Sequence, residues 1–331
     1  MKRISIVILT DHTNHSQFNS FYGIATELFL QFGVREVIIV SRKDKRNKGF
    51  FTDGNSDHLY GVKLTEPIYF ENREILDFSD LIILRRDVYF LLRLPHPVSP
   101  TFLLNLEKEH GADRIINRPS GILKTGSKAF LPSLNREFIP SMNLCETAEG
   151  ILAFLEEHPK SVLKPIMNYG GKGIVKIEED KVYTEQETIS LSEFISNYRI
   201  RSQTYLAVEY LENVKNGDKR IVVADGQILS ATLRFPAEGG WLCNIAQGGR
   251  DKVSEPTLRE KEIVEYLSPI LLNEGILIYG LDTLENNRGE RVISEINTLS
   301  PGGITPYEMH TGDKVTQTLA KLIIDYCYQK T

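Results

Sequence analysis

Two polar residues near the end of the chain have the types and spacing of metal ligands. Glu295 and Asn297 lie two positions apart in the segment 291–297, which carries β-branched Val292 and Ile293 and is predicted to be a strand. Residues two apart on a strand face the same way, and carboxylate and amide oxygens are hard ligands of the kind that Mg²⁺ prefers. A simpler interpretation stays open here, because exposed Glu and Asn side chains on a strand are usually only hydrated.

The residues around this pair extend the candidate site. After the strand comes the turn Ser300-Pro301-Gly302-Gly303, whose backbone can approach a ligand closely. Before it, a strand predicted at 276–284 pairs with 291–297 across the turn 286–289 and carries Asp282. Three oxygen-bearing side chains would then converge from adjacent strands. They are too few to enclose an ion alone, which suits Mg²⁺ shared with the phosphates of ATP.

A Gly-rich loop follows a lysine that lies inside an apolar strand. Lys164 sits in the predicted strand 161–165 and needs an anion, because burying an unpaired charge is costly. The loop 168–173, Asn-Tyr-Gly-Gly-Lys-Gly, offers backbone N–H groups that can fold over phosphates. The loop lacks the Gly-Lys-Ser/Thr ending of a Walker A motif. In protein kinases the Gly-rich loop precedes the lysine, which is the reverse of the order here. The alternative is an ordinary structural turn.

A third segment has a layout that suits a nucleotide. The strand predicted at 204–211 carries Glu209 near its end, and after the turn 216–218 come Lys219 and Arg220. The backbone at the strand end can pair with a base edge, a carboxylate can hold a ribose, and an arginine can face phosphates. An ordinary charged hairpin would have the same composition, so this segment gains weight only beside the other two.

Composition excludes several classes of protein. The chain has 331 residues, 41% of them hydrophobic and 25% charged, which is typical of a soluble globular protein with two or three packed units. The net charge of −5 and the pI near 5.9 give no basic surplus for nucleic acid or an anionic membrane. The short basic cluster 42–48 is bounded by turn residues, which favours a solvated loop over a nucleic-acid surface.

Cysteine content and the chain's start indicate a cytoplasmic protein. Cys145, Cys243 and Cys327 are far apart and odd in number, which argues against a disulfide framework and for a reducing compartment. The first residues do not resemble a signal peptide. No apolar run is long enough to span a bilayer.

The elements that must position these side chains begin with a β-α-β pattern. A strand at 4–9, a helix at 18–32 and a strand at 34–40 predict a parallel sheet with helices on its faces. The segment 42–57 is predicted to be an exposed loop. A strand predicted at 80–84 ends in Arg85-Arg86-Asp87, where ligands usually bind in open α/β sheets, although surface charges at a strand end are the alternative.

The rest of the chain predicts a mixed α+β arrangement. The break at 117–121 is the first domain boundary, and Asp225-Gly226 is a hairpin signal between two strands. The segment 238–249, which contains Trp241, is predicted to be irregular. Helices are predicted at 102–110, 126–134, 147–157, 191–198, 258–272 and 315–328, and further strands at 114–116, 174–177, 220–224 and 227–234.

Taken in chain order, these motifs resemble the ATP-grasp ligases. The motifs are Lys128, Lys164-Pro165, Gly170-Gly171-Lys172-Gly173, Glu209-Tyr210-Leu211, 215–220, Gly280-Leu281-Asp282 and Glu295-Ile296-Asn297. The resemblance is strongest to bacterial glutathione synthetases, to which the segments 216–226, 280–301, 84–87 and 116–119 are similar. It covers essentially the whole chain. It implies an ATP-grasp fold with an N-terminal α/β domain (1–120), a central lobe with a Gly-rich lid (121–203) and a C-terminal lobe with the metal and substrate sites (204–331).

The resemblance also implies a reaction and a role for each residue. A substrate carboxylate would attack the γ-phosphate of ATP, and an amine would then attack the acyl phosphate to form an amide, because in-line phosphoryl transfer needs mostly positioning and charge neutralisation. The implied partners are small carboxylate and amine substrates, in a homo-oligomer (dimer or tetramer). For the nucleotide, the resemblance implies phosphate binding by Lys128 and Lys164, a lid formed by Tyr169, Gly170, Gly171, Lys172 and Gly173, and adenosine binding by Glu209, Tyr210, Leu211 and Lys215. For the reaction, it implies catalysis by Arg220 with Lys164, and two Mg²⁺ ions, or Mn²⁺, bound by Asp282, Glu295 and Asn297. The implied substrate contacts come from Arg86, Arg234, Asn244, Ser300 and Gly302.

Two departures from the family pattern concern the substrate end. Leu242 and Thr305 stand where the family has arginines. Trp241 and Cys243 could form a more apolar pocket instead, or Trp241 could simply pack the loop. Three hypotheses follow: a ligase joining γ-glutamylcysteine to glycine, a ligase of the same chemistry for another amino acid or peptide pair, and a non-catalytic nucleotide-binding regulator.

Overall fold

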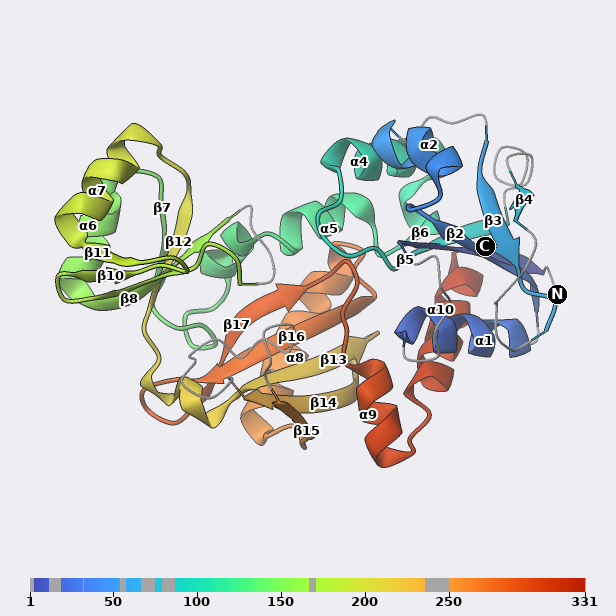
Figure 1. The fold of residues 1–331 in the computed structure, drawn as a ribbon. Coiled ribbons are helices and arrows are strands. Elements are labelled where there is room, and N and C mark those ends of the chain that lie inside the picture. Colours follow the sequence, from blue (N-terminus) through green and yellow to red (C-terminus); the bar gives the residue numbers. More distant parts are fainter. Residues whose placement is uncertain are drawn as a thin grey trace.

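The chain folds around three β-sheets. The computed structural model describes residues 3–11, 19–31, 33–53, 58–66, 75–78, 87–166, 171–235 and 250–330. Within these residues the strand orders are β4-β3-β2-β1-β5-β6, β11-β10-β9-β8-β12-β7 and β15-β14-β13-β16-β17. Figure 1 shows the first sheet at one end of the molecule, the second at the other and the third between them. The predicted combination of α/β and α+β parts is confirmed.

The first sheet has the predicted parallel centre. β1 pairs in parallel with β2 on one side and with β5 on the other. All seven residues of β1 are buried, and five of them are apolar, as expected for a parallel strand covered on both faces. α1 starts where the Asn19 side chain accepts a hydrogen bond from the Phe21 N–H. The elements are β1 (Ile4–Thr10), α1 (Ser20–Leu30), β2 (Val34–Ser41), β3 (Tyr60–Lys63), β4 (Leu76–Asp77), β5 (Val88–Leu92), α4 (Pro100–His110), the 3₁₀ turn Ala112–Arg114 and β6 (Ile115–Ile116).

Two expectations for this part were incomplete or wrong. The strand beside β1 is β5, which was not predicted, whereas the strand expected at 80–84 lies outside the described residues. The segment expected to be an exposed loop forms a 3₁₀ turn (Lys45–Asn47) and α2 (Lys48–Asp53). Phe50 and Phe51 are buried there, with ring centroids 5.5 Å and 5.3 Å from that of Phe102 in α4. Burial of two aromatic rings is the physical reason for the helix.

The second sheet is antiparallel throughout and carries helices on one face. Thr147 and Ser190 cap its helices by accepting hydrogen bonds from Gly150 N and Glu193 N. The predicted helix at 126–134 is a 3₁₀ helix, Lys128–Ser133, with Pro132 inside it, and it follows an unpredicted helix α5. The elements are α5 (Pro119–Thr125), β7 (Met142–Cys145), α6 (Ala148–Glu157), β8 (Lys160–Pro165), β9 (Val175–Glu178), β10 (Lys181–Tyr183), β11 (Thr188–Ser190), α7 (Leu191–Ile200) and β12 (Tyr205–Glu209).

The third sheet carries the predicted strand pairs. The hairpin expected at Asp225-Gly226 is confirmed, and both residues have positive φ (49° and 74°), as in a type I′ turn. α8 starts with a capping box between Thr257 and Glu260. The elements are the 3₁₀ helix Glu212–Asn216, β13 (Asp218–Ala224), β14 (Gln227–Phe235), β15 (Arg250–Val253), α8 (Leu258–Asn273), β16 (Ile278–Glu285), β17 (Arg291–Asn297), α9 (Ile304–Thr311) and α10 (Val315–Gln329).

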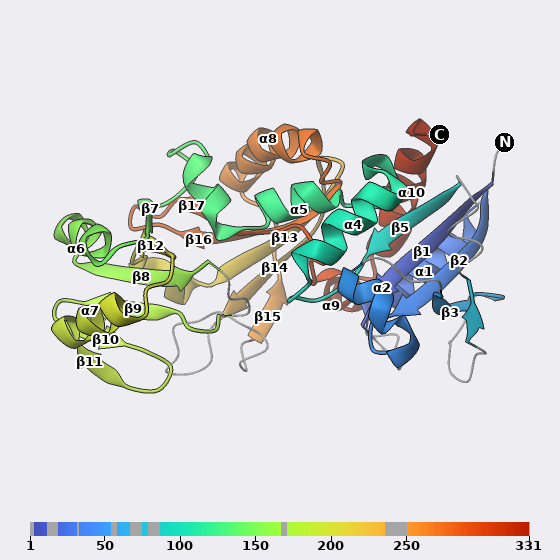
Figure 2. The ribbon, with the colours of Figure 1, turned by 90° about the horizontal axis from the view of Figure 1, so that it is seen from above.

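The last helix returns to the first sheet. α10 lies beside α1 in both ribbon views (Figures 1 and 2), and the Tyr89 hydroxyl of β5 donates a 2.8 Å hydrogen bond to the Cys327 carbonyl. One hydrophobic cluster joins β1, β5, α1 and α10 to Val222 of β13 and Ile278 of β16. The first and third sheets therefore share a core, which fixes the loops between them.

Candidate active site

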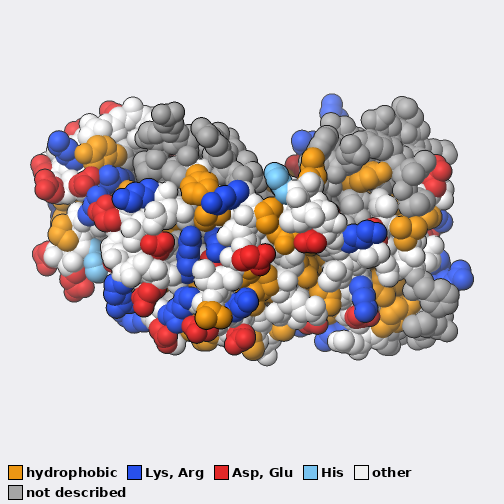
Figure 3. Space-filling model, turned by 90° about the horizontal axis from the view of Figure 1, so that it is seen from below, with side chains coloured by type: hydrophobic (Ala, Val, Ile, Leu, Met, Phe, Trp, Pro, Cys, Tyr) orange, Lys and Arg blue, Asp and Glu red, His pale blue; other side chains and the backbone are white. Residues whose placement is uncertain are grey.

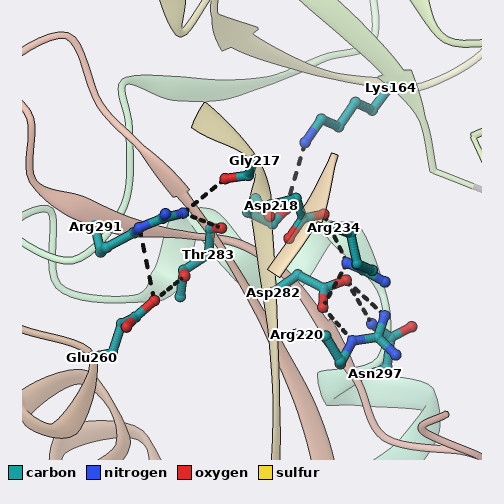
Figure 4. Close-up of polar contacts among 11 residues, drawn as sticks. Lys164, Gly217, Asp218, Arg220, Arg234, Glu260, Asp282, Thr283, Arg291 and Asn297 are labelled. Carbon is teal, nitrogen blue, oxygen red and sulfur yellow. Dashed lines mark hydrogen bonds and ion pairs between the residues drawn. The ribbon is translucent and has the colours of Figure 1, made fainter. Parts of the chain in front are cut away.

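One face of the third sheet gathers the charged residues singled out in the sequence. Asp282 lies opposite both Arg220 on β13 and Glu295 on β17 in the strand register, and Asn297 is opposite Gly280. Arg234 on β14 is opposite Asp218. Figure 4 shows Lys164 reaching this face from β8 of the second sheet, where its Nζ lies 3.5 Å from the Ser294 carbonyl. The sequence-predicted catalytic and metal residues thus come together.

Asp282 is the centre of this network. Its carboxylate accepts hydrogen bonds from Arg220 at two points, one of 2.7 Å from Nη2 and a second from Nε, and one of 3.3 Å from Asn297 Nδ2. Arg234 Nη2 lies 3.1 Å from Asp282 Oδ1. Burial opposes ionisation, but the two guanidinium groups outweigh it and hold the pKa of Asp282 below its usual value. Asp282 is therefore a preformed anion.

Asp218 is a site residue that the sequence did not single out individually. It binds Arg234 Nη2 at 2.7 Å through Oδ2, while Asp218 Oδ1 and Arg234 Nε are buried with no hydrogen-bond partner in the described part of the chain. Burial, reinforced by the charge of Asp282, raises the pKa of Asp218 to about 7. Asp218 lies two positions before Arg220 on β13, and this spacing on a strand was the available signal.

Two lysines lie next to this network. Burial lowers the pKa of Lys164, an effect partly offset by Glu295, Asp218 and Asp282. Burial also lowers the pKa of Lys128. The charge of Glu295 raises that pKa in part, and the charge of Lys164 lowers it further. Both amines are therefore close enough to Glu295 to sense its charge, and a polyanion between them would favour their charged forms. Their side chains come from different elements, the 3₁₀ helix and β8.

The segment predicted to bind adenosine is partly engaged by the protein itself. Glu209 Oε1 accepts a 2.8 Å hydrogen bond from Ser141 N. The Tyr210 N–H donates to the Lys160 carbonyl, and the Tyr210 carbonyl accepts from Asn287 Nδ2 at 3.2 Å. Leu211, buried next to them, is the remaining residue of the motif, and Lys215 lies in the following 3₁₀ helix.

The described end of the Gly-rich loop already binds a carboxylate. Gly171 and Gly173 have φ of 79° and 70°, which side chains rarely adopt, and the Gly173 N–H donates a 2.7 Å hydrogen bond to Glu185 Oε1. Lys172 is exposed between them. An N–H group that binds one anion can bind another, which suits the expected phosphate contact. Tyr169 and Gly170 lie outside the described residues.

The substrate end is described only in part. Arg86, Asn244 and the neighbouring residues Trp241, Leu242 and Cys243 lie outside the described residues. Ser300 is half-buried and Gly302 is exposed, with open space where a Cβ would be. Thr305 lies in the first turn of α9, an element that was not predicted.

Two residues of the first sheet reach this loop and were missed as individual site residues. Arg93 Nη2 donates a 3.0 Å hydrogen bond to the Pro301 carbonyl, and Asn117 Nδ2 donates one of 2.6 Å to the Thr298 carbonyl. The signal for Arg93 was a charged residue directly after the apolar run 88–92, which is buried as β5.

The rest of the surface is mixed in charge. Figure 3 shows one face on which Lys and Arg side chains alternate with Asp and Glu, with no continuous basic area among the side chains described. In the basic cluster 42–48, Arg46 pairs with Asp44 at 2.7 Å and Arg42 donates to the Pro97 carbonyl. Within the described ranges, no helix is both long and apolar enough to cross a membrane, and no three His, Cys, Asp or Glu side chains gather as a metal site.

Comparison with known proteins gives consistent results. The model of the family described as prokaryotic glutathione synthetase, ATP-grasp domain, matches residues 128–312. The glutathione synthetase of Nitrosomonas europaea is 32% identical over 247 residues, which cover 74% of this chain and 71% of that protein. The glutathione synthetase of Brucella melitensis is 27% identical over 319 residues, which cover 95% of this chain and 94% of that protein.

Solved structures agree on the fold. The D-cycloserine synthetase DcsG has a TM-score of 0.65 at 11% identity and covers 98% of this chain and 99% of its own. The ATP-grasp ligase PsnB, complexed with a minimal precursor, has a TM-score of 0.62 at 14% identity with the same coverage. These similarities confirm the predicted fold.

Proposed function

The chain belongs to the prokaryotic glutathione synthetase family and is an ATP-dependent carboxylate–amine ligase with an ATP-grasp domain, and we propose that it joins γ-glutamylcysteine to glycine through an acyl phosphate. The observation that carries this proposal is the gathering of Lys164, Arg220 and Asp282 on one face. Family membership argues against the third hypothesis, a non-catalytic regulator. The three-domain division at 120 and 203 stays a prediction.

The phosphates of ATP would lie between the two lysines. Lys128 and Lys164 come from different elements, and burial lowers the pKa of each amine, so a polyanion would stabilise both charges. The backbone N–H groups of Gly171 to Gly173 would cover the phosphates, replacing the carboxylate of Glu185 at Gly173. Glu209, Tyr210, Leu211 and Lys215 would hold the adenosine, with the Leu211 backbone facing the base.

The donor set fits Mg²⁺, which this family uses with ATP. Asp282 and Glu295 are adjacent across β16 and β17, and Asn297 follows on the same face. The Asn297 amide nitrogen donates to Asp282, which leaves the amide oxygen for a cation. Two carboxylates and one amide would bind two ions whose remaining ligands come from the nucleotide and water. The ions would neutralise phosphate charge; Mn²⁺ has a similar preference for oxygen.

The side chains of this protein would then act on the two steps. The donor carboxylate oxygen forms a bond to the γ-phosphorus, and the bond from that phosphorus to ADP breaks. The amine nitrogen next attacks the acyl carbon, a proton leaves the nitrogen, and phosphate departs with its bonding electrons. Arg220 and Lys164 would stabilise the negative charge on the transferring group. Arg234, whose Nε has no acceptor in the described part, would face a substrate carboxylate.

A ligase for another substrate pair is the second candidate. Thr305, in the first turn of α9 next to Ser300 and Gly302, stands where the resemblance implies an arginine for the carboxylate of a small amino acid. A hydroxyl there cannot form a bidentate ion pair. Arg86 and Asn244 stay proposed substrate residues.

The decisive experiment measures ADP and phosphate release from the purified protein. Release should require Mg²⁺, a donor and an amine together, and a matrix of γ-glutamyl dipeptides against amino acids should identify the pair. Mass spectrometry of the product separates γ-glutamylcysteinylglycine from other amides. A protein that binds ATP but turns it over with no pair would refute the ligase reaction.

Two further properties belong to the proposal. We expect a dimer or tetramer, which light scattering after size exclusion will measure. We also expect a cytoplasmic location. Cys145 and Cys327 are buried and form no disulfide among the described residues, which suits a reducing compartment.

A further inference from the structure

Arg93 is a buried arginine without a carboxylate partner in the described part of the chain. It follows β5 directly, is 5% exposed, and burial lowers its pKa to about 10. Its Nη2 donates hydrogen bonds to Ser20 Oγ at 2.8 Å and to the Pro301 carbonyl at 3.0 Å. A buried charge held mainly by neutral acceptors is costly for stability, which favours a functional role for Arg93.

The carbonyl that Arg93 holds belongs to the loop 300–303, which packs on the catalytic face. Gly280 of β16 lies under Pro301, since a Cβ added at Gly280 would be 2.9 Å from Pro301 Cβ and 3.2 Å from Arg220 Cδ. A Cβ added at Gly303 would be 3.4 Å from Arg220 Cγ. The loop 300–303 therefore lies between Arg93, which binds the Pro301 carbonyl, and Arg220, which is close to Gly303.

A second contact from the first sheet holds the start of the same segment. Asn117 Nδ2 donates to the carbonyls of Thr298 (2.6 Å) and Ile278 (2.5 Å), and Asn117 Oδ1 accepts from the N–H groups of Leu277 and Ile278. Asn117 thus fixes the segment where it leaves β17. Within the described residues, Arg93 is the only residue of the first unit that binds Pro301, which lies between Ser300 and Gly302.

We propose that Arg93 is a positioning residue for the acyl acceptor: it holds the loop 300–303 against Arg220 and so sets where the attacking amine binds. This inference rests on the proposed ligase function. A displacement of about 1 Å in a reacting geometry lowers a rate by roughly 10²-fold, and one charge-assisted hydrogen bond to Pro301 is the contact that prevents it. The nucleotide contacts lie on other elements, so ATP binding should not depend on Arg93.

Arg118 provides a matched control. It is also an arginine of the first unit, its Nε is also buried without a partner in the described residues, and its side chain packs on the third sheet's unit at Gly275. Gly275 follows α8 and is far in sequence from the loop 300–303. Arg118→Met should therefore lower stability without changing the acceptor's KM.

The test compares Arg93→Met, Arg93→Lys and Arg118→Met with the wild-type enzyme. Arg93→Met should raise the KM for the amine and lower kcat/KM for it by about 10-fold or more, with the KM for ATP within about twofold of wild type. Added guanidinium should restore part of the activity of Arg93→Met and none in Arg118→Met. Arg93→Lys keeps the charge, but its shorter side chain replaces the planar guanidinium with a single ammonium group, so an intermediate defect is expected. An unchanged acceptor KM, or an equal loss for ATP and amine, would overturn the inference.

A measurement without turnover separates this inference from the ligase proposal. Hydrogen exchange of the peptide that contains residues 298–303 should speed up in Arg93→Met and Arg93→Lys and stay at the wild-type rate in Arg118→Met. Unchanged exchange in both Arg93 variants would refute the positioning role whether or not the wild type is active. If exchange is faster in both Arg93 variants but the wild-type protein turns over no substrate pair, the ligase proposal alone would be refuted.

Discussion

Arg220 and Asp282 lie directly opposite each other on β13 and β16, and the guanidinium of Arg220 bonds both oxygens of the Asp282 carboxylate. The two residues are proposed for different tasks, Arg220 for the transferring phosphoryl group and Asp282 for the metal. In the protein alone they neutralise each other, with Arg234 as a second cation on Asp282. Binding of Mg²⁺ with ATP would give Asp282 a new cation and leave Arg220 available for the phosphates.

Asp282→Asn should abolish turnover while the fold is kept. Asn keeps a hydrogen-bond acceptor for Arg220 and loses the charge that would hold the metal. We expect kcat to fall by about 10²-fold or more, with far-UV circular dichroism unchanged. Glu295→Gln should lower kcat in the same way. Asn216→Ala, at an exposed residue of the same unit, should leave kcat unchanged. Full activity in Asp282→Asn would show that the metal assignment is wrong.

Gly280 and Gly302 form a matched pair for testing the packing of the loop. Gly280→Ala places a Cβ 2.9 Å from Pro301 Cβ, so the loop or Arg220 must move, whereas Gly302→Ala points into open space. Overpacking of this kind costs about 1–3 kcal/mol. We expect Gly280→Ala to lower both the melting temperature and kcat, and Gly302→Ala to leave the melting temperature unchanged. Equal melting temperatures for the two variants would contradict the close contact.

The sequence predicted those parts of the site that depend on local pattern. The strands β16 and β17, their pairing and the shared face of Glu295 and Asn297 follow from alternation and a turn, and the structure has all three. The hairpin at Asp225-Gly226 follows from turn chemistry alone. Roles that need bound ligands, such as phosphate binding by Lys128, stay predictions.

The features that the sequence did not predict depend on contacts between distant segments. β5 is a strand because it lies between β1 and β6. The run 88–92 directly follows the charged residues 85–87, which were interpreted as the end of an earlier strand. α2 forms because Phe50 and Phe51 pack on α4, although its sequence has the charge and glycine content of a loop. The ion pair of Arg220 with Asp282 needs the register of β13 on β16, which no local pattern supplies.

His96 gives the protein a pH-dependent stability with a defined sign. Burial, together with the charges of Lys128 and Arg42, lowers the pKa of His96 from 6.5 to about 4. Between these values the unfolded chain binds a proton that the folded chain does not, so stability falls as pH drops from 6.5 to about 4. His96→Asn should flatten this part of the stability curve, as measured by thermal melting at several pH values. His58→Asn, at an exposed histidine, is the control. A His96→Asn curve parallel to the wild-type curve would count against the lowered pKa.

Glu260 should contribute most of the polar stabilisation of α8 on the third sheet. It is fully buried and accepts hydrogen bonds from Lys219 Nζ at 2.8 Å, from Thr283 Oγ1 at 2.6 Å and from Thr257 N at 2.8 Å. Glu260→Ala leaves the buried charge of Lys219 without its partner, which costs about 3–5 kcal/mol. Glu262→Ala, on the same helix, removes an exposed carboxylate and should cost less than about 1 kcal/mol. Urea denaturation followed by circular dichroism will compare the two. The same midpoint for both variants would mean that α8 is held by apolar packing alone.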